Sequence, residues 1–90
     1  MRKNYSSSRA VPRLRVMLGQ RVRAIRYDRN LSQVELGRKA SLSGKFIGEV
    51  ERGDKSISID SLYHVARVLR VSLPDLLAAE PAGAKRRARA

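Results

Sequence analysis

The most restrictive feature of the sequence is a pair of helix-start signals near its middle. Ser32 and Glu35 form the S-x-x-E pattern of a capping box, which fixes the residue at which a helix begins. This helix is expected to run to about Ala40, and Ser43 is expected to cap the next helix after a short turn. Residues 32 to 53 are therefore restricted to two short helices joined by a tight turn.

Apolar periodicity predicts a longer helix before this pair, over residues 13 to 28. Its apolar face carries Leu14, Leu18, Val22 and Ile25, and its opposite face carries Arg13, Arg21, Arg23 and Arg26. Asn30 can end this helix because asparagine tolerates the left-handed backbone conformation. Gly53 is expected to end the helix that Ser43 begins, for the same reason.

Two more helices are predicted after Gly53. Ser58 or Asp60 caps the fourth helix, whose buried side is Leu62, Val65, Ala66 and Leu69. The fifth helix begins at Ser72, and Pro74 lies in its first turn, where a missing N–H costs nothing. Its apolar face carries Leu73, Leu76 and Leu77. The fold class predicted from these patterns is all-α, with five short helices.

The length of 90 residues is that of a single domain. Residues 1–12 and 80–90 are polar, basic and without helical periodicity, so we expect a flexible basic arm and a basic tail around a domain at 13–79. The chain has no cysteine, and one histidine, His64, cannot build a metal site or a catalytic triad. The sequence also shows no nucleophile–base pair, no phosphate-cradling glycine loop and no second domain to sense a ligand, so we expect no enzyme activity, no cofactor and no small-molecule ligand.

The formal net charge of +12 points to a polyanionic partner. Nucleic acid is favoured over a membrane surface because no apolar run is long enough to span a bilayer. No apolar signal segment follows the basic N-terminus, so a cytoplasmic location is expected. Aromatic residues make up only 4% of the chain, which argues against single-strand binding by base stacking.

Residues 32 to 53 have the features of a DNA-binding helix-turn-helix. Gln33 lies at the start of the helix that follows Ser32, where its amide and the free backbone N–H groups can meet a phosphate. Gly37 is small enough for the helix that follows Ser43 to pack closely against it. The apolar residues expected to hold the two helices at a fixed angle are Leu36, Ala40, Leu42, Ile47 and Val50.

The string LSQVELGRKASLSGKFIGEVERG resembles the Cro/repressor-type helix-turn-helix domains, also called the xenobiotic-response-element (XRE) type. The fourth and fifth helices of that family are similar to the later string SISIDSLYHVARVLRVSLPDLL. The first helix of the family is similar to the earlier string LGQRVRAIRYDRNLS. The resemblance covers about residues 14 to 78 and implies a five-helix, lambda-repressor-like DNA-binding domain. The combination of KFIGEVERG and SISIDSL further resembles small stand-alone regulators, including controller proteins of restriction–modification systems.

The resemblance implies that the recognition helix lies within Ser43 to Arg52. Gln33 would clamp a phosphate, and Gly44, Lys45 and Glu49 fall at base-contact positions. The full set of DNA-binding residues implied is Gln33, Ser43, Gly44, Lys45, Phe46, Gly48, Glu49 and Arg52. Phe46 and Arg52 would make neighbouring phosphate or groove contacts. Arg26 and Glu51 match an Arg–Glu bridge of the family.

The sequence departs from the family pattern at three places. Gly44 and Gly48 are expected to remove side chains from the face turned toward the groove. Glu49 is acidic, and it could either accept from a cytosine amino group or take part in an internal ion pair. Ser41 stands where the family has a turn glycine.

These observations predict a sequence-specific transcription regulator that binds double-stranded DNA as a homodimer. A general charge-driven nucleic-acid binder and an antitoxin-like interaction partner are the alternatives. The dimer is expected to form through Leu73, Leu76 and Leu77 with Val68 of the fourth helix. Alternatively, the three leucines pack into the core of their own domain.

Overall fold

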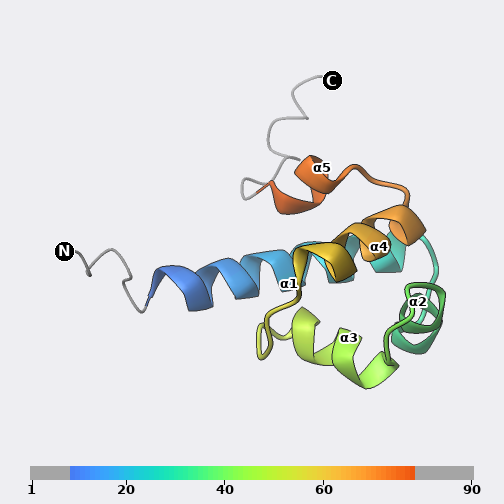
Figure 1. Cartoon of the computed structure of the whole chain (residues 1–90), viewed down its shortest axis with the longest axis horizontal. Coiled ribbons are helices and arrows are strands. Elements are labelled where there is room, and N and C mark those ends of the chain that lie inside the picture. The colour runs from blue at the N-terminus through green and yellow to red at the C-terminus, as the bar shows by residue number, and fades with distance from the viewer. Residues whose placement is uncertain (1–8, 79–90) are drawn as a thin grey trace.

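The computed structural model describes residues 9–78, which form five helices joined by short loops. The helices are α1 (Ala10–Asp28), α2 (Gln33–Lys39), α3 (Gly44–Glu51), α4 (Ile59–Leu69) and α5 (Leu73–Leu77) (Figure 1). The prediction of an all-α, five-helix fold is confirmed for this part of the chain. Most of the predicted arm and all of the predicted tail lie outside the described residues. Within residues 9–78, no helix is long and apolar enough to cross a membrane.

Serine hydroxyls cap the N-termini of four helices. Ser32, Ser43, Ser58 and Ser72 each accept a hydrogen bond from the backbone N–H three residues further on, over 2.9 to 3.1 Å. Each bond satisfies one backbone donor that the first turn would otherwise leave unpaired. Ser58, and not Asp60, is the cap of α4. The capping signals in the sequence therefore located these four helix starts correctly.

A residue with positive φ ends each of α1 to α4. These residues are Asn30 (58°), Ser41 (62°), Gly53 (80°) and Arg70 (62°). In all four turns the next N–H donates to the carbonyl five residues earlier, for example Leu42 N to Gly37 O over 2.7 Å. This bond pattern belongs to the Schellman motif and satisfies carbonyls at the helix end. The predicted stops at Asn30 and Gly53 are confirmed.

We expect Ser41→Gly to raise the free energy of unfolding by about 1 kcal/mol, because a Cβ atom is unfavourable in the left-handed conformation that Ser41 adopts. In a domain of this size that corresponds to an increase in Tm of about 4–8 °C. Thermal denaturation followed by circular dichroism measures the change. Ser56→Gly, at an exposed loop position without positive φ, is the matched control and should give no increase.

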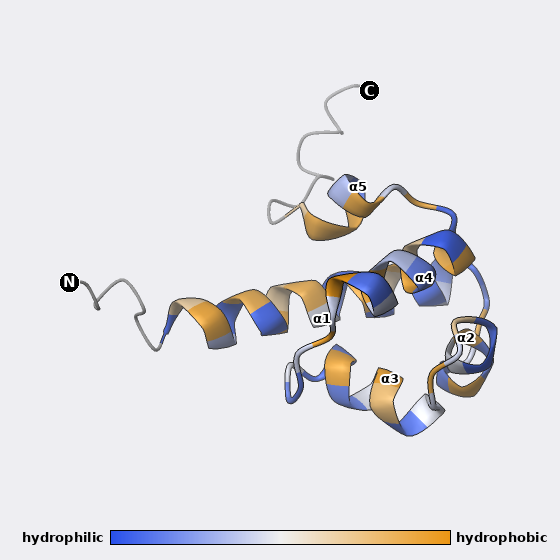
Figure 2. Cartoon of the chain, viewed as in Figure 1, coloured by the Kyte–Doolittle hydropathy of each residue, from blue (hydrophilic) through white to orange (hydrophobic). Residues whose placement is uncertain are grey.

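One apolar core lies between α1, the α2–α3 pair, α4 and α5. Its buried residues are Val22, Leu36, Ala40, Ile47, Leu62, Val65, Ala66, Leu69 and Leu76. The apolar faces predicted for the second, third and fourth helices are thus turned inward. Figure 2 shows these helices with apolar and polar residues on different faces. The core fixes α2 and α3 against α1 and α4.

Three predictions for α1 are wrong. The helix begins at Ala10 instead of residue 13, and 54% of Leu14 is exposed although its spacing placed it on the inward face. The first turns of α1 extend beyond the core (Figure 1), so the described residues do not cover Leu14. Arg26 was assigned to the polar face, but it lies one helical turn after Val22 and is buried beside it.

The apolar residues of α5 also differ from the prediction. Leu76 is fully buried in the core, and Leu73 packs partly buried against it. Val68 of α4 is likewise partly buried against the core, so Leu77 is the one exposed member of this set. The alternative that the leucines pack into their own domain therefore holds for Leu73 and Leu76. Of the surface predicted to form the dimer on α5 and the end of α4, Leu77 is thus the large apolar side chain that stays exposed in the single chain, and the dimer itself stays a prediction.

Candidate nucleic-acid interface

Helices α2 and α3 form a rigid pair that exposes one edge of α3. Ile47 and Val50 face the core, whereas 82% of the Lys45 side chain and 59% of the Arg52 side chain are exposed. Gly37 permits the close packing that the sequence predicted. A Cβ atom on Gly37 would lie 2.7 Å from the carbonyl oxygen of Leu42. The helix pair can therefore be this tight only with glycine at position 37.

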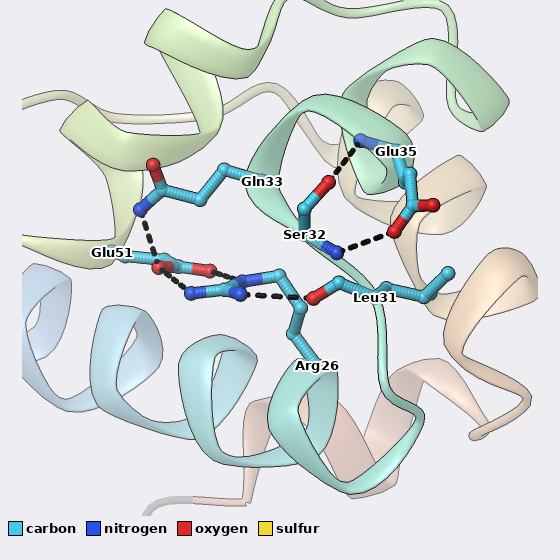
Figure 3. A network of polar contacts seen from close by, with 6 residues as sticks. All are labelled: Arg26, Leu31, Ser32, Gln33, Glu35 and Glu51. Carbon is cyan, nitrogen blue, oxygen red and sulfur yellow. Dashed lines mark hydrogen bonds and ion pairs between the residues drawn. The ribbon is translucent and has the colours of Figure 1, made fainter.

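A buried ion pair ties α1 to the end of α3 (Figure 3). Arg26 Nε donates to Glu51 Oε2 over 2.6 Å, and Arg26 Nη2 donates to Glu51 Oε1 over 2.9 Å. Arg26 Nη1 also donates to the Leu31 carbonyl oxygen over 2.9 Å. The carboxylate of Glu51 raises the pKa of Arg26 above its ordinary value, against the lowering effect of burial. The Arg26–Glu51 bridge implied by the resemblance is thus present.

The same carboxylate orients Gln33 at the start of α2. Gln33 Nε2 donates to Glu51 Oε1 over 3.0 Å (Figure 3). This bond uses one of the two amide hydrogens of Gln33, so the other is available to an acceptor outside the domain. The capping box beside it is complete, with Ser32 N donating to Glu35 Oε1 over 2.8 Å. That N–H bond lowers the pKa of the Glu35 carboxyl.

Glu49 lies between two exposed lysines beside the edge of α3, and only 16% of its own side chain is exposed. Lys45 Nζ is 3.0 Å from Glu49 Oε2, and Lys55 Nζ is 3.6 Å from Glu49 Oε1. The hydrogen bond from Lys45, together with the two positive charges, lowers the pKa of the Glu49 carboxyl, against the raising effect of burial. The internal ion pair that the sequence left open is therefore present. Each carboxylate oxygen still has a lone pair for a second donor.

The two glycines of α3 face α2. A Cβ atom on Gly44 would lie 2.8 Å from Val34 Cγ2, and one on Gly48 would lie 3.3 Å from Gln33 Oε1. Gly48 is buried, so the expectation that its missing side chain clears the groove-facing surface is wrong. Its missing side chain instead leaves room for the Gln33 amide.

The remaining candidate residues lie at the ends of α3. Ser43 Oγ is occupied as the N-cap, where it accepts from Phe46 N over 3.0 Å. Phe46 is half-buried. Arg52 Nε is 3.0 Å from Asp54 Oδ2, in a pair with both side chains more than half exposed. A surface pair of this kind contributes little to stability and can exchange its partner for another anion.

Sequence reasoning missed Lys55 and Gly19. Lys55 follows the Gly53 turn and lies beside the α3 edge through Glu49. Gly19 lies on the inner face of α1, where a Cβ atom would be 2.4 Å from the carbonyl oxygen of Val50. A glycine inside an otherwise helical apolar pattern is a sequence signal for close packing. This signal was available for Gly19, whereas Lys55 looked like any other surface charge.

Comparisons with known proteins agree with this geometry. A helix-turn-helix family model matches residues 22–76. The control protein C.BamHI of Bacillus amyloliquefaciens is 35% identical over 65 residues, which are 71% of this chain and 80% of that protein.

Two solved structures are also similar. The clp gene regulator ClgR of Corynebacterium glutamicum has a TM-score of 0.73 and 32% identity, covering 84% of this chain and 82% of that one. The restriction–modification controller protein C.AhdI of Aeromonas hydrophila has a TM-score of 0.67 and 32% identity, covering 69% of this chain and 94% of that one. The chain therefore belongs to the XRE-type helix-turn-helix family of DNA-binding regulators, with restriction–modification controller proteins among its relatives.

Proposed function

We propose that the chain is a cytoplasmic transcription regulator that binds a duplex operator as a homodimer, with one α3 helix in the major groove of each half-site. The exposed edge of α3 carries this proposal. Lys45 and Glu49, one helical turn apart, bring their ammonium and carboxylate groups to 3.0 Å, beside a Gln33 amide held by Glu51. The relatives named as control proteins support a regulatory role on DNA. The proposal contains no catalytic step.

The proposed roles follow from the donors and acceptors available. Gln33 offers its free amide hydrogen to a phosphate oxygen, which positions the domain without selecting a sequence. Lys45 can donate to the O6 and N7 atoms of guanine, and Glu49 can accept from the amino group of cytosine. Arg52 and Lys55 flank this edge with exposed positive charge. Base contacts therefore come from Lys45 and Glu49, and backbone contacts from the residues around them.

We expect Lys45→Ala to reduce discrimination between operator and random DNA by about 1–3 kcal/mol, because it removes a base contact. Gln33→Ala should instead weaken binding to both DNAs by the same factor, since phosphates carry no sequence. The measurement is fluorescence anisotropy at several salt concentrations, with an operator obtained by selection from random duplexes. Lys39→Ala, an exposed lysine at the end of α2, is the matched control for charge loss.

A charge-driven binder is the competing function, and the net charge of +12 favours it. Both functions predict binding that weakens steeply as salt rises. Only a sequence-specific regulator would yield a consensus sequence in the selection. Only for such a regulator would Lys45→Ala reduce the affinity for the operator more than the affinity for random DNA. If the selection yields no consensus, the regulator proposal is wrong.

A further inference from the structure

We propose that a hollow at the C-terminal ends of α1, α2 and α4 binds an acidic and apolar segment of another protein. The hollow has a volume of about 620 Å³ and is lined by Arg29, Leu31, Lys39, Val68 and Arg70. In Figure 1 the ends of α1 and α4 lie beside α2, at the opposite end of the domain from the start of α1. None of the residues proposed to contact DNA lines the hollow, so this proposal goes beyond the proposed function.

The charge of the hollow has one sign. Its lining contains three cations and no acidic side chain among the described residues. Arg29, Lys39 and Arg70 are all exposed, and none of them forms an ion pair within residues 9–78. A hollow lined by charges of one sign focuses their field. It therefore attracts anionic groups more strongly than cations scattered over the surface would.

Arg29 is positioned to bind a carboxylate. Its Nε donates to the Leu69 carbonyl oxygen over 2.7 Å, which fixes the guanidinium against the end of α4. That bond leaves the two terminal nitrogens as donors toward an acceptor outside the chain. Two N–H groups of one guanidinium can donate to both oxygens of a carboxylate, and such bidentate pairs are stronger than neutral hydrogen bonds.

Arg70 occupies a backbone position that favours glycine. Its φ of 62° lies in the left-handed region, where a Cβ atom is unfavourable. Glycine would end α4 with less strain. The arginine side chain therefore lowers the stability of the domain while it brings a second guanidinium to the hollow. A strained residue of this kind indicates a role in binding.

The apolar part of the lining favours a protein over a nucleic acid. Leu31 and Val68 pack partly buried against the core, and the rest of their surface is open to the hollow. A DNA backbone brings phosphates but no apolar group to cover this surface. A protein segment with an apolar side chain among its carboxylates covers it and gains the free energy of apolar burial.

A second copy of the chain lacks such a segment. The chain has eight acidic residues, and no two of them are adjacent in the sequence. Glu51 is buried in its pair with Arg26, and Glu49 is held by two lysines. The occupant is therefore a different protein, with clustered acidic residues.

The test is fluorescence anisotropy of the full chain with a labelled peptide of repeated Asp-Glu-Leu at physiological ionic strength. We expect saturable binding, and binding at least about 10-fold weaker for Arg70→Gly, because a charged hydrogen bond is lost. The same variant should melt above wild type, since glycine removes the strain at the end of α4. A loss of affinity together with a gain in stability cannot result from unfolding.

Arg67→Ala is the matched control, because it removes the same charge from the last turn of α4, outside the hollow. It should bind the peptide like wild type. A second peptide, with serine in place of each leucine, keeps the charge but leaves Leu31 and Val68 uncovered. We expect it to bind more weakly than the leucine peptide.

Several outcomes would overturn the proposal. The first is the absence of saturable binding, and the second is an equal loss for Arg70→Gly and Arg67→Ala, which would show general charge attraction. Equal binding of the two peptides would contradict the apolar part of the site. If Arg70→Gly weakens binding to the selected operator and the operator displaces the peptide, the hollow is a DNA contact instead. The selection of an operator does not depend on these results, so the proposed function is tested separately.

Discussion

Glu51→Ala is expected to lower the free energy of unfolding by about 3–5 kcal/mol, because it leaves the Arg26 guanidinium buried without its counter-ion. Only 6% of the Arg26 side chain and 1% of the Glu51 side chain are exposed, so water cannot replace the lost carboxylate. A decrease in Tm of about 12 °C or more follows for a domain of this size. Chemical denaturation followed by circular dichroism measures the loss.

Two further variants test the explanation. Glu49→Ala removes the same side chain from the same helix, but its partners Lys45 and Lys55 are 82% and 55% exposed, so no buried charge is left unpaired and the variant should melt near wild type. The double variant Arg26→Met/Glu51→Leu should be less destabilised than Glu51→Ala, because no unpaired charge remains. If Glu51→Ala melts like wild type, the ion pair is not a structural element of this domain.

Gly19→Ala is the second substitution with a large expected effect. The new Cβ atom would lie 2.4 Å from the carbonyl oxygen of Val50 and 2.5 Å from that of Glu51. Both atoms belong to the backbone of α3, which cannot rotate away, so α1 and α3 must separate. We expect a loss of about 3 kcal/mol, at the upper end of the range for overpacked cores. Thermal denaturation measures it.

Gly48→Ala is the matched control, since it makes the same change in α3. Its Cβ atom would meet the side-chain ends of Gln33 and Arg52 at 3.3 to 3.4 Å, and these can move. Alanine also favours the helix by about 1 kcal/mol over glycine. Gly48→Ala should therefore be as stable as wild type, but bind DNA more weakly because the Gln33 amide is displaced. If Gly19→Ala and Gly48→Ala melt alike, steric exclusion by α3 does not explain Gly19.

Local chemistry made much of the fold predictable from the sequence. Capping serines such as Ser32 and Ser43, and helix stops such as Asn30, act within a few residues of themselves, so the sequence located them correctly. The periodicity of apolar residues likewise placed Leu62 and Leu69 in the core. The Arg26–Glu51 bridge was predictable only through the family resemblance, because the two residues are distant in the sequence.

The features that the sequence did not predict depend on which helices and loops pack against each other in the folded chain. The spacing of Leu14 matches an inward face, but the neighbouring elements cover this turn of α1 only in part and leave 54% of Leu14 exposed. The missing side chain of Gly48 was expected to clear the surface that faces DNA. It instead leaves room for the Gln33 side chain, because α2 packs on that side of α3. The position of Lys55 beside Glu49 depends on the path of the α3–α4 loop, which no periodic pattern encodes.

The way Glu51 and Glu49 are held has an evolutionary consequence. Gln33 takes its orientation from a carboxylate that also neutralises Arg26, so selection for folding would also preserve the phosphate contact proposed for Gln33. Lys45 and Glu49 bind mainly each other and Lys55 at the surface, so substitutions there leave the core intact. Under the proposed function, descendants of this chain can therefore change operator specificity at Lys45 and Glu49, while the contact proposed between Gln33 and the DNA backbone is kept.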